Sequence, residues 1–171
     1  MSEPKLVTRS RHGYVLHLGR DERALVTRLL GELRTLLTDP DADPALLHRL
    51  YPVVHPDHAD REEEYQRLMR SELVTSRLAG LDALDEVLGS SGRKIDLDEA
   101  QLLAFMQAVN SVRLVLGTLL DLGEEDELDE DDPPEHHLYG YLSWILDAAV
   151  RAMSDAAAPG AGPGGSEGGG W

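Results

Sequence analysis

The sequence predicts a mainly α fold: a single-domain helical bundle with a small two-stranded β element. Apolar residues recur at spacings of three and four over four long segments, which is the period of one face of a helix. Only two short segments show the alternation that is typical of a strand. A chain of 171 residues with 42% hydrophobic residues is long enough to bury the core of one domain.

The two predicted strands are short and lie far apart in the chain. Tyr14, Leu16 and Leu18 occupy alternate positions in the segment HGYVLHL, and Ile95 and Leu97 do so in RKIDL. We expect these two strands to pair with each other.

The four predicted helices have recognisable ends. The first follows the first strand and ends at TDPDADP, because proline cannot continue a helix. The second begins after Asp60, an expected N-cap, and ends at Gly89. The third covers roughly 99–121, with Asp98 and Gln101 expected to form a capping box. The fourth lies in HLYGYLSWILDAAVRAMSDAA.

The domain is expected to cover residues 12–156. Residues 157–171 are rich in Gly and poor in large side chains, so they cannot bury a core of their own. A disordered Gly-rich tail is therefore predicted for this segment.

The most apolar helix carries an unusual polar motif. In QAVNSVRLVLG, Asn110, Arg113 and Gly117 follow one another at three and four residues and share one stripe of the helix. A buried guanidinium needs a partner, and we expect Glu72, an acid in the middle of the preceding helix, to supply it. The motif is then a buried polar clamp between helices; the alternative is that Arg113 holds the carboxylate of a ligand or partner.

A run of eight carboxylates precedes the last helix. It lacks the glycine and the ligand spacing of a calcium loop. We expect either a solvated loop or a docking patch for a basic partner surface. The residues are Glu124, Glu125, Asp126, Glu127, Asp129, Glu130, Asp131 and Asp132.

His55 and His58 are the only weak candidates for metal ligands. They stand three apart beside aspartates in HPDHADREEE, but no third ligand accompanies them at a fixed spacing. We therefore expect a solvated loop there, with no metal and no cofactor.

Composition and missing motifs exclude several classes of function. The net charge of −16 disfavours direct DNA binding unless the few basic residues cluster on one face. The absence of cysteine excludes thiol chemistry. No nucleophile elbow, phosphate-binding loop or zinc-protease motif is present, so no enzymatic activity is expected. Because no signal peptide or membrane span is apparent, we expect a cytoplasmic protein without membrane contact.

The helix DEAQLLAFMQAVNSVRLVLGTLLDL resembles the hallmark C-terminal helix of a family of actinobacterial oxidative-stress transcriptional regulators, the AosR type, formerly of unknown function. Three further segments resemble other parts of that family in the same order: LGRDERALVTRLL, LLHRLYPVVHPDHADREEEYQRLMRSEL and YLSWILDAAV. The likeness covers roughly residues 12–153.

The resemblance implies a small helical regulator of stress-responsive transcription, with a sigma factor or RNA polymerase as its partner. Redox control by a Cys-x-x-x-Cys pair, attributed to this type of regulator, does not carry over to a chain without cysteine. We expect a non-enzymatic regulator that acts by protein–protein contact, with a homodimer through an exposed apolar helix face as a further expectation. The alternatives are an adaptor in Clp-linked proteolysis, because relatives are encoded beside a Clp adaptor, and a small-ligand-binding helical domain.

Overall fold

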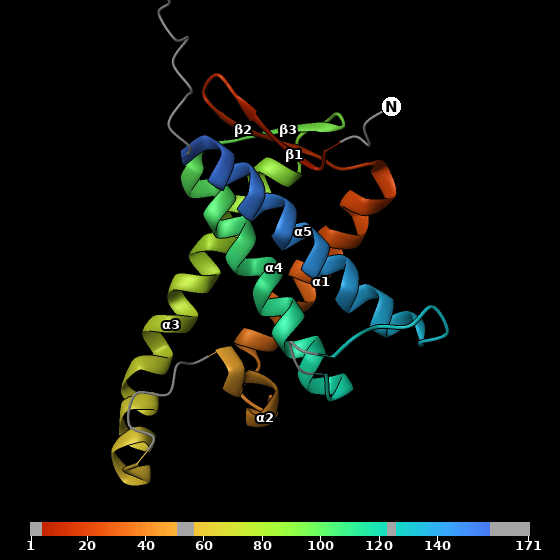
Figure 1. The fold of residues 1–171 in the computed structure, drawn as a ribbon. Helices are drawn as coiled ribbons and strands as arrows, with labels where there is room; N and C mark the ends of the chain where they lie inside the picture. Colours follow the sequence, from red (N-terminus) through yellow and green to blue (C-terminus); the bar gives the residue numbers. More distant parts are fainter. Residues whose placement is uncertain (1–4, 51–56, 123–125, 158–171) are drawn as a thin grey trace, which may run out of the picture.

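The computed structural model describes residues 5–50, 57–122 and 126–157, and it confirms the mainly α fold (Figure 1). In chain order the elements are β1 (Val7–Ser10), β2 (Gly13–His17), α1 (Arg20–Thr38), α2 (Pro44–Leu47), the short 3-10 helix η1 (His48–Leu50), α3 (Ala59–Leu88), β3 (Lys94–Leu97), α4 (Glu99–Leu120) and α5 (Pro134–Ala157). His55, Glu124, Glu125 and residues 158–171 lie outside the described residues.

The sheet has three strands, one more than the sequence predicted. The two predicted strands pair antiparallel as β2 and β3, with Leu16 opposite Ile95. The additional strand, β1, pairs with the other edge of β2 and places Val7 opposite Leu16. β1 gives no clear signal because its sequence, VTRS, has a single apolar residue. It also precedes residue 12, where the domain was expected to begin.

The sheet lies across one end of the helical bundle (Figure 1). Its apolar face is buried, and Tyr14, Leu16, Ile95 and Leu97 all belong to the core. The strands pack against α3, α4 and α5, so the sheet closes this end of the core.

The most apolar helix, α4, is the central one. It contacts α1, α2, α3, α5 and two strands, and it buries Leu102, Phe105 and Val109. By length and composition alone α4 could cross a membrane, but a helix surrounded by other elements needs the same apolar character. Its predicted capping box is confirmed, since Asp98 Oδ1 accepts from the Gln101 amide at 2.7 Å and the Asp98 amide donates to Gln101 Oε1 at 2.9 Å.

The longest helix, α3, is only partly packed. Its buried residues, Leu81, Leu84 and Leu88, all lie in the last third, and its N-terminal half extends beyond the other helices (Figure 1). The helix begins at Ala59, with His58 rather than the predicted Asp60 in the N-cap position. The predicted end at Gly89 is confirmed.

Candidate functional site

Arg113 on α4 faces α5. Its Nη2 donates to Asn110 Oδ1 at 3.0 Å, and its Nη1 makes a long hydrogen bond of 3.5 Å to Ser143 Oγ. The guanidinium carbon also lies 5.7 Å from the centre of the Tyr139 ring, within range of a cation–π interaction. Arg113 therefore joins α4 to α5, with Asn110 orienting it from one turn earlier.

Gly117 belongs to the same cluster because it allows a close approach of three segments. A Cβ at this position would lie 3.0 Å from Tyr139 Cε2, 3.2 Å from Arg49 Nη1 and 3.3 Å from the Leu122 carbonyl oxygen. Arg49 Nη1 donates to that same oxygen at 3.0 Å. The stripe that the sequence singled out thus faces α5, and Tyr139 is the residue that it packs against.

The expected pair between Arg113 and Glu72 does not form among the described residues. Glu72 is exposed on α3, and the side chain of α3 that reaches α4 is Arg77. The reason is helical phase: Leu73 and Leu81, which face the core, lie four residues before and after Arg77. The same spacing, read from the sequence, could have identified Arg77.

Arg77 links three elements. Its Nη1 donates to Ser111 Oγ on α4 at 2.9 Å, and its Nη2 donates to the carbonyl oxygen of Leu50 in η1 at 2.9 Å. Ser111 is only 2% exposed and donates in turn to the Gln107 carbonyl oxygen at 2.8 Å. The void beside Arg77 and Ser111 measures about 10 Å³, which is room for about one water molecule. This cluster therefore holds helices together and leaves no space for a substrate.

An apolar groove opens at the surface between four helices. It has a volume of about 250 Å³, and among the described residues that line it Glu32 on α1 is the only polar one. The most exposed member is Leu119 on α4, at 62%. The other lining residues are Leu29, Leu33 and Leu36 of α1, Leu46 of α2, Val112, Val115 and Leu116 of α4, and Leu138 of α5.

The larger hollow between α2 and α3, about 580 Å³, differs in character. Most of its α3 lining is charged or polar, and Arg67 and Glu63 there form an exposed ion pair at 3.8 Å. Because this hollow is an open surface with charged residues along one side, the groove is the more distinctive feature for recognition.

Acidic residues lie close in the chain to several lining residues of the groove. The connection from α1 to α2 holds Asp39, Asp41 and Asp43, and α4 ends at Asp121, the only non-glycine residue with positive φ (55°) among the described residues. The acidic run then connects Leu119 of the groove to Leu138. No Lys or Arg lies between positions 113 and 151, while that stretch holds eleven Asp and Glu residues.

The described part of the acidic run, residues 126–132, is folded onto the domain. The Asp129 amide donates to Asp132 Oδ2 at 2.7 Å, which forms a turn. Leu128 Cδ1 would lie 2.8 Å from a Cβ at Gly140, so the run packs closely on α5 through this leucine. The exposed carboxylates of Asp129 and its neighbours are thus held beside the N-terminal end of α5, where negative charge is favourable.

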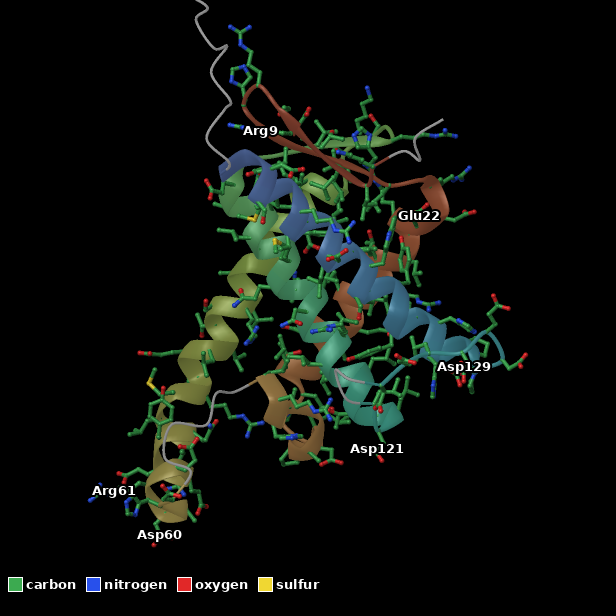
Figure 2. The ribbon with its side chains drawn as sticks, viewed as in Figure 1. Arg9, Glu22, Asp60, Arg61, Asp121 and Asp129 are labelled. Atoms are coloured by element: carbon green, nitrogen blue, oxygen red, sulfur yellow. The ribbon has the colours of Figure 1, made fainter. Side chains whose placement is uncertain are left out.

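Several positive residues gather at the sheet end of the molecule, although Arg49 of η1 lies at the acidic end, where it donates to the Leu122 carbonyl oxygen at 3.0 Å. Residues 5–20 contain Lys5, Arg9 and Arg11 as well as Arg20, with no Asp or Glu. Figure 2 shows Arg9 at the sheet and Asp121 and Asp129 at the far ends of α4 and the acidic run. Leu119 of the groove lies two residues before Asp121, so this part of the groove is at the end of α4 away from the sheet.

Tyr141 joins α5 to α1 on another side of the bundle. Its hydroxyl donates to Glu22 Oε2 at 3.0 Å, and its ring stacks on Trp144 with 5.9 Å between the ring centres. Burial raises the pKa of Tyr141 well above its usual range, and the hydrogen bond to Glu22 and the charge of that carboxylate add to the effect.

The metal candidates gain no support. Within residues 5–50, 57–122 and 126–157, no group of three or more His, Cys, Asp or Glu residues is placed to hold a metal ion. His58 stands at the N-cap of α3, and His55 lies outside the described residues.

Fold and groove together define a small helical domain with an apolar surface groove. The chain belongs to the family described as "Domain of unknown function (DUF2017)", which it matches over residues 2–153. Comparison with curated proteins and with solved structures gives no match.

Proposed function

We propose that this protein is a non-enzymatic regulator of stress-responsive transcription that acts by binding another protein, with the groove as its docking surface. The observation that carries the proposal is the apolar lining of that groove, which four helices leave open to solvent. Contiguous exposed apolar surface on a soluble domain is typical of an interaction site.

Leu119 is the residue that best supports a docking role. A leucine that is 62% exposed, beside further Leu and Val side chains, gains by being covered. Full burial of a leucine contributes about 1.5–3 kcal/mol, so covering the exposed part of Leu119 would contribute about 1–2 kcal/mol. Apolar anchors of this kind provide much of the free energy of protein–protein association.

The biological context of the proposal comes from the resemblance to regulators of the AosR type. On this basis the partner is a sigma factor or a subunit of RNA polymerase. The chain contains no cysteine, so its input is not a thiol–disulfide switch within the chain. Direct DNA contact is not the proposed mode, because the net charge of −16 disfavours binding to a phosphate backbone.

The test is a pull-down of the tagged chain from host lysate, with bound proteins identified by mass spectrometry. Three forms are compared: the wild type, Leu119→Gln, and the matched control Leu68→Gln. Leu68 is 69% exposed and lies on the extending half of α3, away from the groove. Both substitutions replace an exposed leucine without changing the charge, and circular dichroism checks that each variant is folded.

We expect the wild type and Leu68→Gln to capture a sigma factor or polymerase subunits. Leu119→Gln should bind the same partner about tenfold more weakly, which corresponds to about 1.4 kcal/mol of binding free energy. Equal capture by all three forms would show that the groove is not the docking surface. Recovery of Clp components in place of the transcription machinery would overturn the transcriptional role and favour the adaptor function.

A further inference from the structure

We infer that the groove accepts a basic amphipathic helix of the partner, whose apolar residues enter the groove while its Lys and Arg residues face the acidic residues near it. The inference rests on the proposed function, since it names the chemistry of the segment that docks at the same surface. It follows from the shape, the lining and the charge of the groove.

The size and lining of the groove favour side chains of a protein over a small molecule. Small-molecule pockets commonly measure about 300–1,000 Å³ and present several polar groups that orient the ligand. This groove is smaller, at about 250 Å³, and the described residues of its lining offer a single polar side chain, Glu32. A few apolar side chains inserted from one face of a partner would fill such a space.

The lining also discriminates among the ways in which a peptide segment is recognised. Addition of a strand requires a sheet edge, but all the described lining residues of this groove lie on helices. Polyproline segments require a groove lined by aromatic rings, and phosphorylated segments require an arginine cluster, whereas the lining is Leu, Val and one Glu. The remaining common mode is a helix whose residues at i, i+3 or i+4 and i+7 enter an apolar groove.

The acidic residues near the groove favour a helix that carries positive charge. Glu32 lines the groove with a side chain that is 67% exposed and lies 3.9 Å from the exposed Arg28 of the same helix, and Asp121 follows two residues after Leu119. Asp39, Asp41 and Asp43 lie in the connection between Leu36 and Leu46, two of the lining residues. A positive side chain of a bound helix that comes within about 8 Å of these carboxylates would be attracted to them at physiological ionic strength. Lysine and arginine beside its apolar face would complement these carboxylates.

The same charge argues against a second copy of this chain as the occupant. In a symmetric dimer through the groove, the acidic residues near the groove of one subunit would face those of the other. With a net charge of −16 per chain, such an arrangement places like charges together. A basic helix from a different protein would avoid this repulsion between like charges.

The experiment titrates the full chain with designed peptides. The probe is a peptide of Leu and Lys, about 18 residues long, with Leu at helical spacing along one face. One control peptide has the same composition in an order without an apolar face, and a second has the Leu pattern with Glu in place of Lys. Isothermal titration calorimetry at two salt concentrations measures the affinity of each peptide for each form of the protein.

The variants separate the apolar and the charged contributions. Leu119→Gln tests the groove and Leu68→Gln is its matched control. Glu32→Gln and Asp121→Asn each remove one acidic charge near the groove; Asn suits the left-handed backbone at position 121. Glu86→Gln removes an exposed charge of α3 and is the control for these two.

We expect the Leu–Lys helix to bind, and the reordered peptide and the Glu peptide to bind at least about tenfold more weakly. Leu119→Gln should weaken binding of the Leu–Lys helix about tenfold, while the two controls leave it unchanged. The variants at Glu32 and Asp121 should weaken it less, and chiefly at low salt. Equal affinity for the reordered peptide, or equal effects of Leu119→Gln and Leu68→Gln, would overturn the inference.

The result is separable from the test of the proposed function. If Leu119→Gln abolishes capture of the transcription partner but the Leu–Lys helix does not bind, the docking surface stands and the inferred partner chemistry is wrong. If the helix binds in a Leu119-dependent way but no transcription component is captured, the inference stands and the transcriptional role is wrong. A wild-type chain that dimerises through Leu119, measured by analytical ultracentrifugation, would also overturn the inference.

Discussion

Replacement of Gly117 by alanine tests whether the polar stripe of α4 is a tertiary contact. Helix propensity alone predicts that Gly117→Ala stabilises the protein by up to about 1 kcal/mol. The structure predicts the opposite sign, because the new methyl group would meet Tyr139 Cε2 at 3.0 Å and Arg49 Nη1 at 3.2 Å.

The size of the effect follows from how little these neighbours can move. Tyr139 is only 6% exposed and is held in the core of the α4–α5 contact, where an added methyl group costs about 1–3 kcal/mol. Displacing Arg49 would also weaken its hydrogen bond to the Leu122 carbonyl oxygen, worth about 1 kcal/mol or more. After subtraction of the propensity gain, we expect Gly117→Ala to lower the free energy of unfolding by about 1–3 kcal/mol.

Two other helical glycines serve as controls. A Cβ at Gly31 meets nothing within 4 Å, and one at Gly80 meets only Ala104 Cβ at 3.9 Å. Gly31→Ala and Gly80→Ala should therefore each stabilise the protein by about 0.5–1 kcal/mol. Urea denaturation followed by circular dichroism measures all three variants. If Gly117→Ala is as stabilising as Gly31→Ala, the close approach of α4 and α5 is wrong.

Three further predictions concern other contacts, and each is tested by urea denaturation. Arg77→Ala should lower the free energy of unfolding by about 3 kcal/mol, because it removes two charge-assisted hydrogen bonds. Glu72→Ala should change it by less than about 0.5 kcal/mol. Equal effects of the two substitutions would contradict the placement of these residues. The raised pKa of Tyr141 means that the folded protein holds the hydroxyl proton of this residue more tightly than the unfolded chain does. The stability that this proton contributes is therefore fully present below about pH 10 and is lost as the pH rises above it. Tyr141→Phe should therefore make the alkaline loss of stability less steep, and an unchanged slope would refute this. Arg34 donates to two exposed aspartates of α3 at 2.6 and 2.7 Å. Arg34→Ala should therefore lower the free energy of unfolding by about 0.5–1 kcal/mol, and by less in high salt. A loss that does not depend on salt would argue against an ionic contribution.

The sequence by itself determined the features that depend on neighbours within a few residues. The capping box of Asp98 and Gln101 and the end of α3 at Gly89 are of this kind, because each is formed by groups three to four positions apart. The common stripe of Asn110, Arg113 and Gly117 is likewise set by the period of one helix.

Only the tertiary structure decided what those local features contact. β1 becomes a strand through its pairing with β2, since VTRS is short and shows no apolar alternation of its own. The spacing of Leu73 and Leu81 indicates that Arg77 faces the core, but only the packing of α3 shows that its partners are Ser111 and the Leu50 carbonyl oxygen. The groove joins residues of α1 and α5 that are more than a hundred positions apart, such as Leu29 and Leu138. Contacts of this range leave no local pattern, because they follow from how the helices pack and not from the order of residues along any one of them.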